Sequence, residues 1–236
     1  MNFKTICISF TLFVNSLQLL GQVTFGPLGG GHYNGVYYPH GITENNLSPM
    51  CSLNSGKITS LDSVQVVGIE YDYSELKVGM GWDEPEFLTK MAEEQNKKKA
   101  GQGDKIKNSW EGFKKNEYEP AFQAAFNKMA AELELGLIGT NYATEKNYTM
   151  LIKVVYIAPG PVTHSSKPAI LDMECVFVNS QGTELCKLFV KNMTGNDMKF
   201  GPEMNERIAH CFHKSAKMLC ERIAAERRKV KRKQNR

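Results

Sequence analysis

A strong amphipathic pattern runs from Asn116 to Leu135. Its apolar side chains recur every three to four residues, as on one face of a helix: Phe122, Phe126, Met129 and Leu133. Pro120 fits the first turn of a helix, where its missing N–H costs no hydrogen bond. The regular helix is therefore expected to begin near Glu119 and to end at Gly136. An apolar face of this width predicts a sheet that packs against it.

Alternating apolar and polar positions predict four strands. Their residues are 63–73, 147–157, 169–178 and 183–191. The last two strands are expected to form a hairpin around the turn at 179–182. A pairing that sets Cys175 opposite Cys186 keeps the apolar side chains on one face and sets Glu174 opposite Lys187 on the other. A register shifted by one residue would place Lys187 and Lys191 among the apolar residues.

Two further helices complete the pattern. A short one is expected after Asp83, which caps it, with Pro85 in its first turn. A long one is expected from Gly201 to about Arg228. The resulting order predicts an α+β two-layer sandwich, in which helices pack on one face of a small, mainly antiparallel sheet.

The domain organisation follows from the low-periodicity segments. Lys4 and the short apolar run 6–14 resemble an export signal, which we expect to end at Gly21. The expected segments are a signal peptide (1–21), a flexible Gly/Tyr-rich arm (22–60), one α+β domain (61–225) with a charged insertion (77–115), and a basic tail (226–236). This organisation predicts an exported protein of the periplasm or the extracellular space.

The net charge of +4 comes from the C-terminal tail. The stretch 226–236 holds seven Lys or Arg against one Glu, a net of +6, so the other residues sum to about −2. Such a tail suits peripheral contact with anionic lipid. An exported protein rarely meets nucleic acid, so no nucleic-acid partner is expected. A solvated helix end is the alternative.

Six cysteines are present, and Cys7 lies within the expected signal. Cys175 and Cys186, opposite each other on the hairpin, are candidates for a disulfide in an oxidising compartment. Cys211 is expected to be buried and reduced. Cys51 and Cys220 are expected to be accessible, because Cys220 lies about 180° around the helix from Cys211.

Two sets of side chains are weak candidates for ligand or metal binding. Tyr33, Tyr37, Tyr38 and Trp82 could stack on a sugar or another small ligand, although packing against their own domain is the more ordinary role. Glu206, His210 and His213 share one helix face and could hold a divalent metal. That face lies opposite the apolar stripe, so we expect it to be solvated.

No catalytic set is evident in the sequence. Asp172 and Glu174 share a strand face and could place two carboxylates for acid–base chemistry, but Glu174 has an expected partner in Lys187. The chain has no dinucleotide or phosphate-binding fingerprint, and no cofactor is implied.

A family resemblance rests on Tyr71-Asp72-Tyr73-Ser74, on Gly101-x-Gly103-Asp104, and on Trp110 and Phe122. With these motifs the chain resembles a family of exported, uncharacterised proteins of Bacteroidetes-type bacteria. More distantly it is similar to TolB amino-terminal-like domains and to auxiliary lipoproteins of ABC-type transport. The resemblance implies an assembly or interaction module of the cell envelope, although the lipid-anchoring cysteine of those lipoproteins is missing.

These observations favour a non-enzymatic exported envelope protein that acts as a protein-interaction or assembly module with an envelope protein as its partner. One alternative is a protein that binds a glycan or another small ligand. A second alternative is a hydrolase whose carboxylates cannot be paired from sequence. An open strand edge would favour the interaction module. A pocket lined with aromatic side chains would favour the ligand-binding protein, and two facing buried carboxylates would favour the hydrolase.

Overall fold

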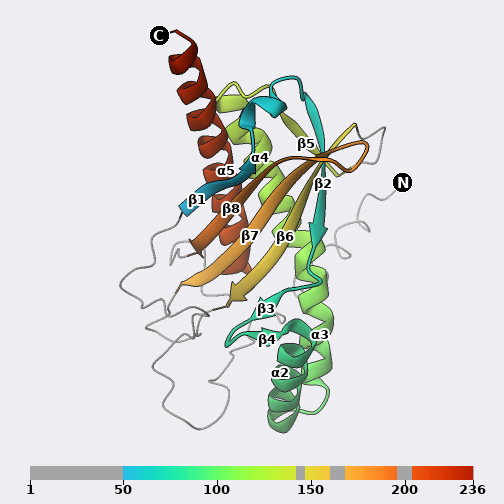
Figure 1. Ribbon diagram of the computed structural model, residues 1–236. Helices are drawn as coiled ribbons and strands as arrows, with labels where there is room; N and C mark the ends of the chain where they lie inside the picture. The colour runs from blue at the N-terminus through green and yellow to red at the C-terminus, as the bar shows by residue number, and fades with distance from the viewer. Residues whose placement is uncertain (1–49, 142–146, 160–167, 196–203, 236) are drawn as a thin grey trace, which may run out of the picture.

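The computed structural model describes residues 50–141, 147–159, 168–195 and 204–235. An open eight-stranded sheet carries α-helices on one face, which confirms the predicted α+β sandwich (Figure 1). The strands are β1 (Met50–Gly56), β2 (Val66–Asp72), β3 (Lys77–Val78), β4 (Trp82–Asp83), β5 (Ile138–Thr140), β6 (Tyr148–Ala158), β7 (Ala169–Asn179) and β8 (Glu184–Gly195). The expected signal peptide and most of the expected arm lie outside the described residues.

The sheet has the spatial order β1-β8-β7-β6-β2-β5. The four strands from β1 to β6 are antiparallel, whereas β2 and β5 run parallel to β6. Beyond the end of β2, the short strand β3 pairs with β6 and with β4. The two edges of the main sheet are therefore β1 and β5.

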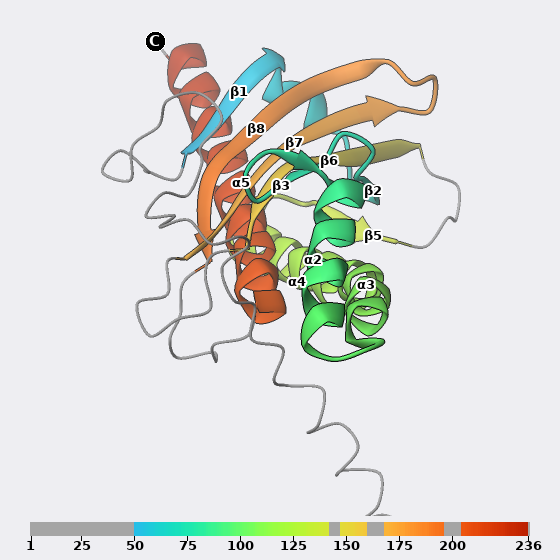
Figure 2. The same cartoon turned by 90° about the horizontal axis from the view of Figure 1, so that it is seen from below.

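Six helical segments accompany the sheet in the described residues. They are η2, a 3₁₀ turn (Ile58–Leu61), α2 (Glu84–Lys98), α3 (Gln102–Phe113), η3, a turn of π-helix (Lys114–Tyr118), α4 (Glu119–Glu132) and α5 (Met204–Gln234). Figure 1 shows α4 and α5 behind the sheet, and Figure 2 shows α2 and α3 beside its β3–β4 end. None of the described helices is long and apolar enough to cross a membrane.

The central helix begins where the sequence predicts, at Glu119, but it continues a longer helical run. Pro120 has no N–H to donate to the preceding turn, and the π-helical turn η3 lies directly before it. The side chains of Phe122 and Phe126 are fully buried and stack with ring centroids 6.3 Å apart. The predicted apolar face is confirmed.

The charged segment 77–115 contains β3 and β4, followed by a helical hairpin of α2 and α3 whose first helix begins after Asp83, as the sequence predicts. Gly101 turns the chain with a φ of 74°, and Gly103 lies so close to α2 that a Cβ there would meet the Ala92 carbonyl oxygen at 2.2 Å. Asn96 accepts a hydrogen bond from the Gly103 N–H at 2.8 Å. The Gly-x-Gly motif is thus explained by the close contact between α2 and α3.

The expected arm is also corrected at its C-terminal end. Residues 50–56 form the edge strand β1, and residues 58–61 form η2, in which Ile58 and Leu61 are buried. In the sequence, only the alternating apolar residues Cys51 and Leu53 indicate this strand. Two apolar residues among Ser, Asn and Gly are too few to predict it.

The β7–β8 hairpin keeps the predicted faces but not the predicted register. The structure pairs Cys175 with Leu188 and Phe177 with Cys186, two residues away from the expected pairing. Asn179 closes a loop in which Gly182 has a φ of 75°, and an irregularity between Phe177 and Val178 adds a further shift. Because the total shift is two residues, every side chain stays on its expected face.

Candidate functional site: the edge and outer face of the sheet

The candidate disulfide is not formed. Cys175 and Cys186 are free thiols in the structure, because the observed register sets neither opposite the other. Burial raises the pKa of the Cys186 thiol to about 12. The expectation for Cys220 was also wrong: its side chain is fully buried and its Sγ lies 3.6 Å from the Phe126 carbonyl oxygen.

Cys220 is buried because α5 packs against both the sheet and α4. Its buried residues include a row spaced by four, which turns about 40° around the helix at each step. The members of this row are Met204, Ile208, Phe212, Ala216, Cys220 and Ala224. Because each step of this row turns around the helix, the buried side changes direction along α5. Cys211, near the start of the helix, lies against Gly195 of β8, whereas Cys220, further along, faces α4.

Trp82 contacts its own domain. Its ring lies 6.4 Å from that of Phe87, measured between centroids, and Lys90 Nζ lies 4.5 Å above the indole. The other three residues of the ligand-binding prediction, Tyr33, Tyr37 and Tyr38, lie outside the described residues. No aromatic ligand site is therefore assembled from the residues that the structure places.

The candidate metal ligands Glu206, His210 and His213 are half-buried, not solvated as expected. The two imidazole rings have centroids 6.1 Å apart. Desolvation, followed by the nearby Lys217, lowers the pKa of His213 below its ordinary value. Within the described residues, no three His, Cys, Asp or Glu side chains are grouped closely enough to hold a metal ion.

The two carboxylates considered for catalysis have structural partners. Glu174 Oε2 lies 3.8 Å from Lys187 Nζ, so the predicted cross-strand pair exists although the register differs. Asp172 Oδ1 accepts a hydrogen bond from the backbone N–H of Asn192 at 2.6 Å. Asn192 has a φ of 55° beside an irregularity in β8, so this bond stabilises an unusual backbone conformation.

A buried polar cluster that the sequence analysis missed joins α2 to η3. Lys114 Nζ lies 2.6 Å from Glu84 Oε1, and the indole N–H of Trp110 donates to the same oxygen at 2.6 Å. Lys114 Nζ also lies 4.6 Å above the ring of Tyr73. The charges are paired within the domain, so this cluster stabilises the hairpin.

The β5 edge of the sheet is closed by side chains of α4. Asn127 Oδ1 accepts from the Gly139 N–H at 2.7 Å, and Asn127 Nδ2 donates to the Gly139 carbonyl oxygen at 2.9 Å. Gln123 Nε2 donates to the same carbonyl at 3.2 Å. The central peptide of β5 therefore has hydrogen-bond partners on the side away from β2, and a further strand cannot pair there.

The β1 edge, which we define as the side of β1 away from β8, is not paired with any strand in the parts of residues 50–235 that the structure describes. The strand has seven residues, MCSLNSG, and contains neither charged residues nor proline. Charges and prolines are two of the means by which natural proteins protect such an edge, and a bulge is a third; β1 has a register shift between Leu53 and Ser55. The β1 edge can therefore accept another extended segment.

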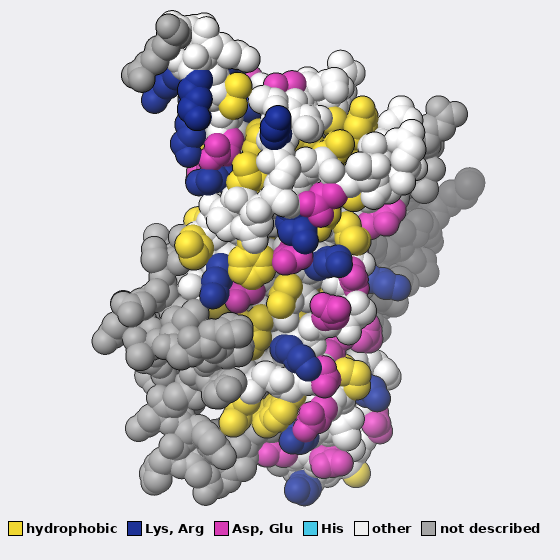
Figure 3. Space-filling model, in the orientation of Figure 1, with side chains coloured by type: hydrophobic (Ala, Val, Ile, Leu, Met, Phe, Trp, Pro, Cys, Tyr) yellow, Lys and Arg dark blue, Asp and Glu magenta, His cyan; other side chains and the backbone are white. Residues whose placement is uncertain are grey.

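The outer face of the sheet, opposite α4 and α5, is not covered by any described α-helix (Figure 3). Its side chains form rows across the strands. One row has the order acid, base, acid, aromatic, hydroxyl: Asp72, Lys153, Glu174, Phe189 and Ser52. All five are half-buried, and Figure 3 shows charged and apolar side chains intermixed on this face. The row ends at the β1 edge.

Two apolar side chains extend this face toward β5. Val66 and Ile138 are directly paired across β2 and β5, and they are 53% and 58% exposed. Together they add exposed apolar area to this face, next to its charged row. Alternation along β2 accounts for the outward direction of Val66, whereas Ile138 lies in a strand of three residues, too short to show such a pattern.

Comparisons with known proteins identify no relative of this chain. No family model matches the chain, and no curated protein and no solved structure is significantly similar to it. The resemblance to exported bacterial proteins therefore stays a prediction.

Proposed function

We propose that this protein is a non-enzymatic interaction module that binds a partner protein by adding an extended segment of the partner to β1. The observation that carries the proposal is the contrast between the two edges of the sheet. Asn127 and Gln123 close the β5 edge, whereas no described strand pairs with the outer side of β1, which has seven uncharged residues. In strand addition, main-chain hydrogen bonds supply affinity and alternate side chains supply specificity.

The outer face supplies the side-chain contacts. A segment added to β1 would place alternate side chains beside Ser52, and beyond it Phe189 and Lys191 of β8 lie on the same face. An aromatic ring between charged neighbours suits an extended peptide that carries both apolar and acidic side chains. The export pattern at the N-terminus supports an envelope or extracellular location for the partner.

The test uses the full-length protein as bait against envelope extracts and culture medium of its native host. The edge variant is Ser52→Lys/Asn54→Lys, which adds two charges at the β1 edge. The matched control is Ser180→Lys/Gln181→Lys, which adds the same charge in the exposed β7–β8 turn. The expected result is a captured protein that the control retains and the edge variant loses, since lysine on an edge strand opposes pairing.

Hydrogen exchange with the purified partner locates the contact. The amides of residues 50–56 should become protected in the complex, and those of Gly139 should not change. Capture that survives in the edge variant, or protection that leaves β1 unchanged, would overturn the proposal.

The two alternatives have less support. Trp82 is covered by Lys90, and Asp172 and Glu174 are held by Asn192 and Lys187. The described residues thus offer no observation that favours glycan binding or hydrolysis over protein binding.

A further inference from the structure

The C-terminal helix α5 is tied to the domain up to Arg227. The guanidinium of Arg227 donates to the carbonyl oxygens of Leu135, at 2.7 Å, and Leu61, at 2.9 Å. Its Nε lies 2.8 Å from Asp62 Oδ1. These three contacts hold the helix between η2 and the segment that leads to β5.

Beyond Arg227 the helix leaves the body of the protein. α5 has 31 residues and is about 46 Å long at 1.5 Å per residue, and Figure 1 shows its C-terminal end beyond the sheet. The last buried residue is Ala224. The expected basic tail therefore continues the helix through Gln234.

The exposed end carries a cluster of cations, which we call the basic tip: Arg228, Lys229, Lys231, Arg232 and Lys233. Spaced as they are, the five side chains lie within an arc of about 200° around the helix. The uncharged Val230 and Gln234 occupy the opposite side. Lys229 bonds Glu226 at 2.9 Å, whereas the other four form no ion pair within the described residues.

We propose that the basic tip binds the surface of an anionic lipid bilayer. Five cations at the projecting end of one helix can approach a flat array of phosphate headgroups together. Clusters of four to eight Lys or Arg have this property, and each contributes about 1 kcal/mol near such a surface. Only Val230 is apolar, so contact is electrostatic and lies at the headgroups.

A bilayer fits the tip better than nucleic acid does. Single-stranded nucleic acid is bound in basic grooves lined with aromatic side chains, and residues 225–236 contain no aromatic residue. A duplex is tracked by basic charge spread over a surface, whereas the chain outside 226–236 sums to about −2. The net positive charge of the chain therefore comes from this helix end.

Sedimentation with vesicles tests this inference with the purified full-length protein. One set of vesicles contains phosphatidylcholine alone, and the other contains phosphatidylcholine with roughly one third phosphatidylglycerol. Binding is expected to the anionic set only and should fall as salt is raised, because screening shortens the range of charge interactions. Lys231→Gln/Arg232→Gln should weaken the partition coefficient by roughly tenfold to thirtyfold, the effect of losing two contacts of this strength.

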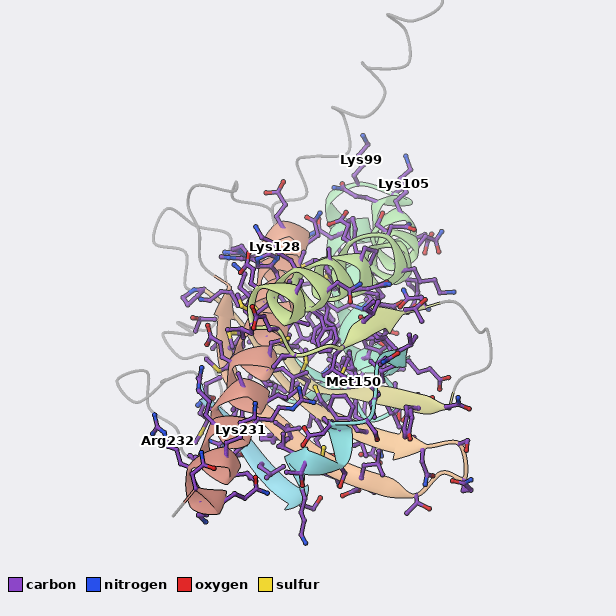
Figure 4. The ribbon with its side chains drawn as sticks, turned by 90° about the horizontal axis from the view of Figure 1, so that it is seen from above. Lys99, Lys105, Lys128, Met150, Lys231 and Arg232 are labelled. Atoms are coloured by element: carbon purple, nitrogen blue, oxygen red, sulfur yellow. The ribbon has the colours of Figure 1, made fainter. Side chains whose placement is uncertain are left out.

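The matched control is Lys99→Gln/Lys105→Gln, which removes the same charge from the far tip of the α2–α3 hairpin. Figure 4 shows these two lysines at the end of the molecule away from Lys231 and Arg232. The control should bind as the unaltered protein does. Equal losses in both variants, equal binding to neutral vesicles, or tighter binding to a short DNA duplex than to the anionic vesicles would each overturn the inference.

Discussion

Asn127 of α4 and Gly139 of β5 are joined by two hydrogen bonds, so that one side-chain amide takes the place of a neighbouring strand. The contact requires close approach: a Cβ on Gly139 would meet Asn127 Oδ1 at 3.3 Å and Ile69 Cδ1 at 2.6 Å. The helix that covers the core therefore also closes one edge of the sheet. Among the described residues, no side-chain amide closes the opposite edge at β1 in this way. This difference between the two edges is the basis of the proposed function.

Asn127→Ala should lower the free energy of unfolding by about 1–3 kcal/mol, because it leaves the buried Gly139 N–H without its acceptor. Urea denaturation measures the change. The control Lys128→Ala removes only an exposed side chain, 3.9 Å from Glu132, and should cost under about 0.5 kcal/mol. Equal effects of the two substitutions would contradict the proposed closure of β5.

The sequence predicts correctly those features that depend on residues close together in the chain. The central helix and the four long strands follow from local periodicity, and the faces of β7 and β8 follow from alternation. The hairpin register does not, because it depends on the conformation of Gly182 and on an irregularity near Val178. Neither of these is encoded in the hydrophobic pattern.

The candidate site was harder to predict for the same reason. Asn127 is an ordinary polar residue in a helix until β5 is placed beside it, and β1 contains only two apolar residues in alternation. The hypothesis of an open strand edge was available from the sequence, but which edge is open follows only from the order of strands in the sheet.

Lys114 supplies a prediction for the α2–α3 hairpin. Its side chain is 7% exposed and its Nζ lies 2.6 Å from Glu84 Oε1. Lys114→Ala should cost about 3–5 kcal/mol in unfolding free energy, because it leaves a carboxylate largely buried without its cation. The exposed neighbour Lys115 is the control, and its substitution by alanine should cost under about 0.5 kcal/mol. A small loss at Lys114 would show that Trp110 alone satisfies Glu84.

The cysteines supply a prediction for chemical labelling. Burial raises the pKa of Cys51 and of Cys220 to about 12, so at pH 8 both are protonated and react slowly with iodoacetamide. Cys51, which is half-buried, should be labelled first, and Cys175 only after denaturation. Mass spectrometry of alkylated, unreduced peptides measures the order. Recovery of a Cys175–Cys186 bridge would instead support the hairpin register predicted from the sequence.

His213 supplies a prediction for pH dependence. Desolvation lowers its pKa in the folded state, so the unfolded chain binds a proton more readily than the native protein does. Its contribution to stability is complete well above the ordinary pKa of 6.5 and is lost as the pH falls through that value toward the lower folded pKa. Urea denaturation from pH 7.5 to 5 should show this decline, and His213→Gln should reduce it. Lys217→Gln should also reduce it, since Lys217 contributes to the lowered pKa.

Two glycines should respond to alanine with opposite signs. At Gly195 a Cβ would meet the Arg207 carbonyl oxygen at 1.9 Å and Cys211 Sγ at 2.7 Å, so α5 must move away from β8. Gly195→Ala should therefore cost about 1–3 kcal/mol or more, as an overpacked core does. At Gly112 of α3 the nearest atom is Asn116 Nδ2 at 3.7 Å, and the backbone is helical. Gly112→Ala should stabilise the protein by about 0.5–1 kcal/mol, because alanine loses less conformational freedom in a helix.

Thermal and urea denaturation of the two variants measure both effects. A Gly195→Ala protein as stable as the unaltered chain would mean that α5 does not pack against the end of β8 as closely as described. That result would also weaken the inference from the basic tip, whose direction depends on how α5 lies on the sheet. A destabilised Gly112→Ala protein would place α3 against a neighbour outside the described residues, because nothing within them fills the space that the new methyl group needs.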